Sequence, residues 1–252
     1  MLTQADIDWI VLDSVDSTNA HLCAAYARGE RTGVVALLAH AQTQGRGRAG
    51  RAWVSEPGAS LCLSIGLPIA GSQLPFLPIC VGVGVAECLQ ASGVRVQLKW
   101  PNDILINGHK LGGILCESGS GPAEPYTVIG LGLNLGPVEV HSPPSGLKAT
   151  FVQAHWPDEQ PMLSNLDWAK RLVPSIVSAV DLGLRSGLAP LAALFSKRDA
   201  FLGQKVVLTD GQKPVAEGIA MGLSESGAYL IDTADGLLPV HAGDLSLRVQ
   251  HG

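Results

Sequence analysis

The sequence predicts an α+β fold, in which a mixed β-sheet covered by helices is followed by a small β-barrel-like region. Strand and helix patterns alternate through residues 1–202, whereas residues 203–252 contain only short strands separated by turns. Of the 252 residues, 46% are hydrophobic and 15% are charged, a composition that buries a full core without disulfides or metal ions. We therefore expect two domains with these bounds.

The strands of the first region are indicated by apolar runs and by alternation of apolar with small or polar residues. Asn107-Gly108 lies between two of these patterns and favours a two-residue hairpin turn, because both positions tolerate a positive φ. Strands are predicted over residues 34–39, 61–67, 94–98, 104–106, 111–116 and 127–135.

Helices are indicated by apolar residues that recur every three or four positions. They are predicted over residues 75–91, from Ser164 as N-cap onward, and over 190–202, with Gly203 just past the end. The proline-rich stretch 136–163 has little periodicity and is predicted to be a long loop. In the last region, strands are expected over residues 205–208, 215–221, 229–232 and 245–249.

The charge and cysteine content narrow the class of protein. A formal net charge of -5 argues against a broad nucleic-acid-binding surface. The five cysteines form no CxxC pair, so they are expected to be mostly buried thiols in a reducing compartment. The N-terminus lacks the segments of a signal peptide, and no run reaches the roughly 18 apolar residues of a membrane helix. We expect a cytoplasmic protein that binds neither DNA nor a membrane.

The segment GRGRAGRAW, residues 45–53, is the strongest local signal. Its glycines have the G-x-G-x-x-G spacing of a dinucleotide-binding loop, but a strand pattern follows where a helix is required, and the acid that should bind the ribose is missing. Arg46, Arg48 and Arg51 stand among the glycines. Glycine allows close approach of the backbone, and guanidinium groups bind phosphate oxygens in pairs. The segment is therefore predicted to wrap an anionic ligand, with an exposed basic turn as the weaker interpretation.

A second polar cluster lies in KWPND, residues 99–103, and KLGGIL, residues 110–115. These stretches place two lysines, an amide and a carboxylate around the predicted hairpin. Lysine stabilises charge that develops between a reacting carboxylate and phosphate, and aspartate or asparagine oxygens can hold magnesium. Either stretch alone is typical of a surface turn, but together with GRGRAGRAW they indicate an active site.

On these motifs the sequence resembles the biotin protein ligase family, the biotin-[acetyl-CoA-carboxylase] ligases. The resemblance implies a catalytic domain of the class II aminoacyl-tRNA synthetase and biotin ligase type, followed by an SH3-like β-barrel. It also implies that biotin and ATP, with Mg²⁺, give biotinyl-AMP, whose acyl group passes to a lysine of a biotin carboxyl carrier protein. The matching stretches run in the family's order: Ser17-Thr18-Asn19, Gln42 with residues 45–53, residues 99–103, 110–115, 130–134 and 245–248.

Matched position by position, the resemblance implies a role for each site residue. The biotin-binding residues would be Ser17, Thr18, Asn19, Gln42, Arg46, Gly47, Arg48, Lys110 and Gly113. The nucleotide-binding residues would be Arg46, Arg48, Arg51, Asn102, Asn134 and Arg248. Lys110, Arg48 and Asp103 would be catalytic, with Asp103 orienting Mg²⁺ or the incoming amine. From the residues alone, a helix N-cap at Ser17 and packing at Trp53 are the competing interpretations.

Several alternatives stay open at this point. Some family members carry an N-terminal winged helix-turn-helix, but only sixteen residues precede Ser17, so a short form without DNA binding is expected. A lipoate ligase or octanoyltransferase would share the fold and the acyl chemistry, although GRGRAGR with KWPND favours biotin. A non-catalytic biotin- or nucleotide-binding module on the same scaffold is the other alternative. The sequence does not distinguish a monomer from a homodimer.

Overall fold

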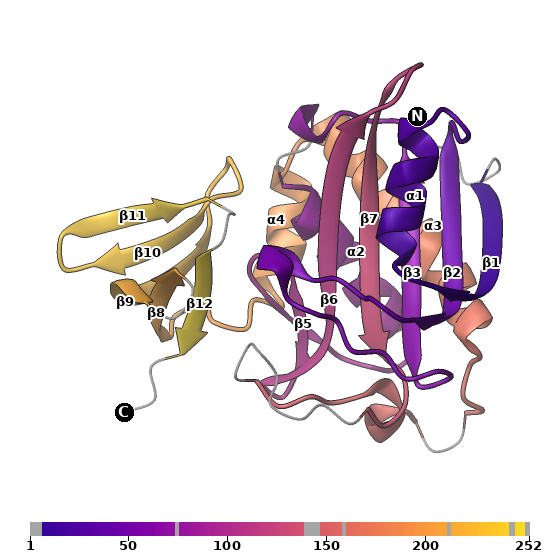
Figure 1. The fold of residues 1–252 in the computed structure, drawn as a ribbon. Helices are drawn as coiled ribbons and strands as arrows, with labels where there is room; N and C mark the ends of the chain where they lie inside the picture. The colour runs from indigo at the N-terminus through magenta and orange to yellow at the C-terminus, as the bar shows by residue number, and fades with distance from the viewer. Residues whose placement is uncertain are drawn as a thin grey trace.

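The computed structural model describes residues 7–73, 76–138, 147–157, 160–210, 213–241 and 245–249. Its strands form a seven-stranded sheet in the order β1-β2-β3-β7-β6-β5-β4 and a five-stranded sheet in the order β11-β10-β9-β8-β12. Figure 1 shows the smaller sheet beside the larger one, after helix α4 in the chain. The predicted α+β class is confirmed, and the antiparallel five-stranded sheet agrees with an SH3-like domain.

The seven-stranded sheet is mixed. Neighbouring strands are antiparallel except β1 and β2, which are parallel and joined through α1 (Thr18–Ala27). Asn107 and Gly108 both have positive φ, as the predicted hairpin turn between β5 and β6 requires. The strand bounds are β1 Ile7–Val15, β2 Val34–Gln42, β3 Ser60–Leu67, β4 Gln97–Lys99, β5 Asp103–Ile106, β6 His109–Ser120 and β7 Pro125–Asn134.

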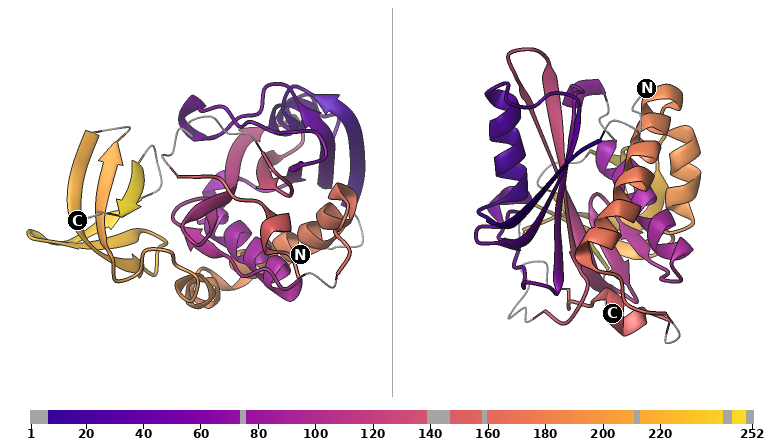
Figure 2. Two further views of the ribbon diagram at one scale, coloured as in Figure 1. Left: turned by 90° about the horizontal axis from the view of Figure 1, so that it is seen from below. Right: turned by 90° about the vertical axis from the view of Figure 1, so that its right-hand side faces the viewer.

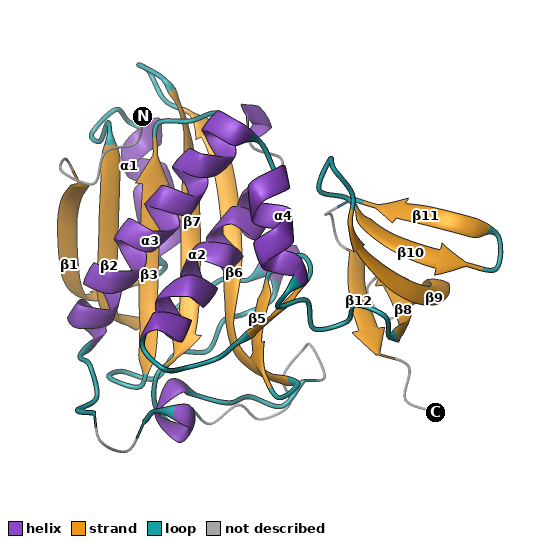
Figure 3. Cartoon of the chain, turned by 180° about the vertical axis from the view of Figure 1, so that it is seen from behind, coloured by secondary structure: helices purple, strands orange, loops and turns teal. Residues whose placement is uncertain are grey.

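Helices cover the two faces of this sheet unequally. Helix α1 lies alone on one face, and α2 (Leu77–Ala91), α3 (Asn165–Ser186) and α4 (Ala189–Ser196) lie on the other, as Figures 2 and 3 show. Ser164 caps α3 as predicted, because its side chain accepts a hydrogen bond from the Asp167 backbone N–H. Among the described helices, one therefore covers the α1 face of the sheet and three cover the other face, so more of the sheet stays uncovered on the α1 face.

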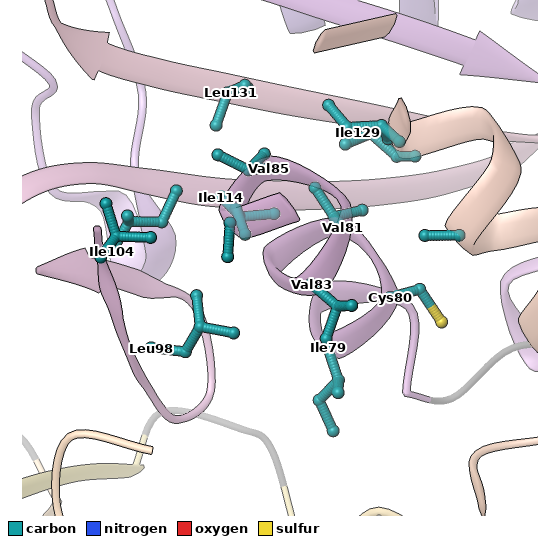
Figure 4. Close-up of a cluster of buried hydrophobic side chains, with 14 of the residues drawn as sticks. Ile79, Cys80, Val81, Val83, Val85, Leu98, Ile104, Ile114, Ile129 and Leu131 are labelled. Atoms are coloured by element: carbon teal, nitrogen blue, oxygen red, sulfur yellow. The ribbon is translucent and has the colours of Figure 1, made fainter. Parts of the chain in front are cut away.

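Large and small residues alternate along the central strands, and this sorts them between the two faces. Leu61, Leu63 and Ile65 of β3 belong to the main core beneath α2 and α3, whereas Cys62 faces the smaller cluster under α1. Figure 4 shows the main core, where valines of α2 lie against Ile114, Ile129 and Leu131 of the sheet. On the α1 face the central strands carry the small residues Cys62, Ser64, Gly130 and Gly132 beside a smaller apolar cluster, and this leaves space for a ligand.

Two sequence-based bounds are wrong. The helix predicted over residues 190–202 ends at Ser196, because the next segment turns back to β4: Leu98 N–H donates to Arg198 O, and Ala200 N–H donates to Leu98 O. The strand predicted over residues 94–98 is only Gln97–Lys99. Both differences arise from tertiary pairing, which local periodicity does not encode.

Residues of the five-stranded sheet join the main apolar core, and one contact with the seven-stranded part is an aromatic pair. The ring of Tyr229 lies 5.6 Å from that of Trp100, in the KWPND turn, and the Tyr229 hydroxyl donates to the Asp199 carboxylate at 2.8 Å. Burial raises the pKa of that Asp199 carboxyl. The strands are β8 Lys205–Asp210, β9 Lys213–Leu223, β10 Tyr229–Thr233, β11 Gly236–Val240 and β12 Leu245–Val249; β11 was not among the predicted strands.

All five cysteines are free thiols, three of them buried and two half-buried, as the sequence led us to expect. Within the described part of the chain, no helix combines the length and apolar character needed to cross a membrane. Short 3₁₀ turns complete the fold at Arg48–Gly50, Gly71–Gln73 and Val152–His155.

The packing of α2 on α3 generates a stability prediction. A Cβ at Gly84 would lie 2.9 Å from Ile176 Cα and Ser175 O, so Gly84→Ala must push the helices apart at a cost of about 1–3 kcal/mol. Gly82→Ala is the matched control, since its Cβ would meet Leu98 Cδ2 at an ordinary 3.4 Å and helix propensity favours alanine. Urea unfolding should show loss of stability only for Gly84→Ala. Equal stability of the two variants would contradict this packing.

Candidate active site

A pocket opens on the α1 face of the seven-stranded sheet. It is bounded by the start of α1, by the loop after β2 and by strands β6 and β7, which are distant in sequence and adjacent in the sheet. Nine of the residues that the family resemblance selected line this pocket: Ser17, Thr18, Asn19, Gln42, Arg46, Gly47, Asn102, Lys110 and Gly113. The sheet pairing thus brings most of the predicted biotin site together.

Glycines make the floor of the pocket. A Cβ at Gly132 would overlap the ring of Trp53, and a Cβ at Gly130 would lie 2.5 Å from Asn19 Oδ1. Gly113 on β6 is the partner of Gly132 in the sheet, and a Cβ there would touch the Lys110 side chain at 3.5 Å. At Gly130 and Gly132, only glycine lets the walls approach the strands this closely.

Polar residues at the start of α1 form the deep end of the pocket. Ser17 is the N-cap of α1, which confirms the cap interpretation, and it also lines the pocket, so a binding role stays a compatible prediction. Thr18 donates to Gln42 Oε1 through its backbone N–H at 2.8 Å and its hydroxyl at 2.9 Å. These two hydrogen bonds fix the oxygen of the Gln42 amide on Thr18. The amide nitrogen, Nε2, then lies near Gly45, since a Cβ built on Gly45 would be 3.2 Å from it.

The GRGRAGRAW segment folds as a small lobe over the pocket. Arg46 and Ala52 form a bridge across it, and a tight turn at its tip uses positive φ at Ala49 (53°) and Gly50 (69°). Arg48 does not line the pocket, but its guanidinium donates to Asn102 Oδ1 at 2.9 Å and so ties the lobe to the KWPND turn. The lobe is therefore clasped to the opposite wall.

Two lysines share one carboxylate, and one of them, Lys110, lines the pocket. Lys99 Nζ lies 2.9 Å from Asp103 Oδ2, and Lys110 Nζ lies 2.6 Å from Asp103 Oδ1. The Lys110 ammonium also lies 5.7 Å from the centre of the Trp53 ring. Burial alone would raise the pKa of the Asp103 carboxyl, but the two lysines outweigh it and lower that pKa to about 2. The Asp103 carboxylate thus holds Lys110 at the pocket wall.

This arrangement does not suit Asp103 as a magnesium ligand. Each of its oxygens accepts from an ammonium group, and Asn102 Oδ1 accepts from Arg48. Among the described residues, no group of three or more histidine, cysteine or acidic side chains is arranged to hold a metal ion. The residues present do not fit a resident magnesium site.

Three other residues expected at the site lie outside the pocket. Arg51 is half-exposed in the lobe, and the buried Asn134 at the end of β7 donates to Thr150 O at 3.0 Å. Arg248 is exposed on β12, paired with Val207 of the smaller sheet. None of these three is among the residues that line the pocket, so their nucleotide roles stay predictions.

Several residues of the pocket wall were not among those predicted from the sequence. Trp53 was treated as a packing residue, yet its ring lines the pocket and, within the described structure, its buried indole N–H has no acceptor. The others lie on β3, β6 and β7, and five of them stand in the stretches 110–115 and 130–134 that the family resemblance matched: Leu63, Ile114, Leu115, Gly130, Leu131 and Gly132.

The Asp103 cluster generates a pH prediction. Its carboxyl binds a proton less tightly in the folded chain (pKa about 2) than in the unfolded one (3.8), so its contribution to stability is complete above pH 4 and falls as the pH drops towards 2. Between pH 4 and pH 2, the free energy of unfolding of the wild type should fall by about 2 kcal/mol relative to that of Asp103→Asn. Urea unfolding at several pH values measures it, and a constant difference between the two proteins would contradict the ion cluster.

Comparison with known proteins agrees with this geometry. The sequence patterns of the Biotin/lipoate A/B protein ligase family and of the biotin protein ligase C-terminal domain match residues 12–134 and 201–248. A biotin--[acetyl-CoA-carboxylase] ligase of Mycobacterium tuberculosis is 34% identical over 97% of this chain and 91% of its own length. The bifunctional ligase/repressor BirA of Escherichia coli is 34% identical, over 94% of this chain and 73% of its own length.

Solved structures lead to the same family. A biotin protein ligase from Aquifex aeolicus, solved in complex with biotin and ATP, superposes with a TM-score of 0.79 at 26% identity and covers 96% of this chain and 99% of its own. The likeness therefore extends over both sheets. The chain belongs to the biotin/lipoate A/B protein ligase family, among its biotin protein ligases.

Proposed function

We propose that this chain activates biotin with ATP as biotinyl-AMP and transfers the biotinyl group to a lysine of a biotin carboxyl carrier protein. The observation that carries the proposal is the Lys110 ammonium, held 2.6 Å from Asp103 at the wall of a pocket whose deep end is neutral and polar. Such a pocket suits an acid with a polar, uncharged head and a carboxylate tail. Biotin has this character.

The deep end offers groups that suit the ureido ring of biotin. A ureido group has two donors and one acceptor, and the Ser17 hydroxyl and the Gln42 amide nitrogen lie where they can pair with it. The Trp53 ring at the pocket wall provides apolar surface for the thiophane ring and the valeryl chain. This orientation directs the carboxylate towards Lys110.

Adenylation is the attack of the biotin carboxylate on the α-phosphorus of ATP, with pyrophosphate as the leaving group. Two anions must approach each other, so fixed cations lower the barrier. Lys110 would lie beside both reacting groups, and Arg46 lines the pocket at the lobe. Because Asp103 already holds the Lys110 ammonium in place, little reorganisation is needed when charge moves to the α-phosphate.

The arginine lobe would retain the product. Biotinyl-AMP is a mixed anhydride that water hydrolyses, so the site has to exclude solvent until the acceptor arrives. The Arg48–Asn102 hydrogen bond clasps the lobe across the pocket. In the second step the neutral amine of the acceptor lysine attacks the acyl carbon, a new amide bond forms, and AMP leaves with the bonding electron pair.

A substrate comparison tests the function. Biotin with ATP should release pyrophosphate and label a biotin carboxyl carrier domain, whereas lipoate or octanoate should not support either step. Activity with lipoate in place of biotin would assign the chain to the lipoate branch of the family. Binding of biotin without pyrophosphate release would indicate a non-catalytic module.

Lys110→Met should abolish activation, since it removes the cation beside the carboxylate and the phosphate. We expect biotin-dependent pyrophosphate release to fall about 100-fold or more. Lys148→Met is the matched control, because the Lys148 side chain is exposed and the charge change is the same. Unchanged pyrophosphate release by Lys110→Met would show that Lys110 takes no part in activation.

Arg48→Ala should separate activation from retention. The variant loses the hydrogen bond to Asn102 that clasps the lobe, so biotinyl-AMP forms but escapes and labels lysines of unrelated proteins. The measurement is biotin incorporation into a non-acceptor protein, with Arg95→Ala, an exposed arginine away from the lobe, as control. Retention of the intermediate as complete as in wild type would contradict the clasp.

A further inference from the structure

The Glu117 side chain stands between two walls of the pocket without lining it. Glu117 lies on β6, and its Oε2 accepts a hydrogen bond from Asn19 Nδ2 at 2.8 Å. Its other oxygen, Oε1, lies 3.9 Å from Arg46 Nη1. One carboxylate therefore contacts both the first turn of α1 and the arginine lobe.

On the α1 side the contact is a buried hydrogen-bond network. The Asn19 side chain is 3% exposed; its Nδ2 also donates to Leu115 O at 3.3 Å, and its Oδ1 accepts from the Ser64 hydroxyl at 2.6 Å. Both ends of this amide are thus bound by protein groups. Asn19 shapes the pocket, and Glu117 is the charged member of the three groups that orient it. Without that acceptor, a buried amide hydrogen would lose its partner.

On the lobe side the contact is a loose ion pair. The Arg46 side chain is 49% exposed and that of Glu117 is 33% exposed, so water screens the pair and its attraction is modest. A modest attraction can still restrain a flexible side chain. It holds the guanidinium near the pocket and leaves it free to turn to an incoming anion.

We propose that Glu117 is a positioning residue for ligand capture: its negative charge keeps Arg46 over the pocket, and its hydrogen bond keeps Asn19 oriented. The inference rests on the proposed function, because the ligand used to test it is biotin. The two effects are chemically separable. The charge acts through Arg46, and the hydrogen bond acts through Asn19.

Two substitutions separate them. Glu117→Gln keeps an oxygen that accepts from Asn19 and removes the charge that attracts Arg46. We expect biotin, titrated by calorimetry without ATP, to bind roughly twofold to fivefold more weakly. Glu117→Ala removes both contacts and should weaken binding about tenfold or more. Glu124→Gln, near the β6–β7 turn and away from the pocket, carries the same charge change and should bind biotin as wild type does.

A double-mutant cycle identifies the route of the effect. If Glu117 acts through Arg46, the loss caused by Glu117→Gln should vanish when Arg46 is already Gln. High salt should also reduce the loss of biotin binding caused by Glu117→Gln, because the Arg46–Glu117 ion pair is exposed. An equal loss in both backgrounds, or equal binding by wild type and Glu117→Gln, would overturn the inference. Wild type serves as the reference for function: if it neither binds biotin nor releases pyrophosphate, the proposed function fails first.

Discussion

Alternation of large and small side chains along β3 and β7 is the constraint on which the site depends. Large residues of these strands face α2 and α3, where they form the main core, and the opposite face carries Ser64, Gly130 and Gly132 beside a smaller apolar cluster. Gly130 and Gly132 let Asn19 and Trp53 approach the strands more closely than any side chain would permit. The same alternation therefore builds the main core on one face of the sheet and the pocket on the other. The sheet holds the pocket walls in place.

The cations of the site are ordered before a ligand arrives. Arg48 donates to Asn102, Lys110 is paired with Asp103, and Arg46 lies near Glu117. Each contact comes from a different strand or turn, so the positive groups converge although the chain carries a net charge of -5. Such preorganisation is what a reaction between two anions requires. The aromatic contact between Trp100 and Tyr229 extends this arrangement, since it anchors the KWPND turn to the smaller sheet.

Features that depend on neighbouring residues could be predicted from the sequence, and features that depend on distant pairing could not. The apolar run of β2, the Asn107-Gly108 turn and the Ser164 cap each have a local cause. The strand β1 was not predicted, because it is a half-exposed edge strand that is stabilised by parallel pairing with β2. Most of the pocket residues were identified through motifs, whereas Glu117 and Ser64 became visible only once β3, β6 and β7 were placed side by side.

The central claim is that this pocket makes and keeps an acyl-adenylate. Native mass spectrometry of the chain after incubation with biotin and ATP, followed by rapid removal of free ligands, tests it directly. The account predicts a one-to-one complex whose added mass is that of biotinyl-AMP, which is lost when an acceptor domain is added. Recovery of the chain with biotin or ATP alone, and never with their condensation product, would contradict it.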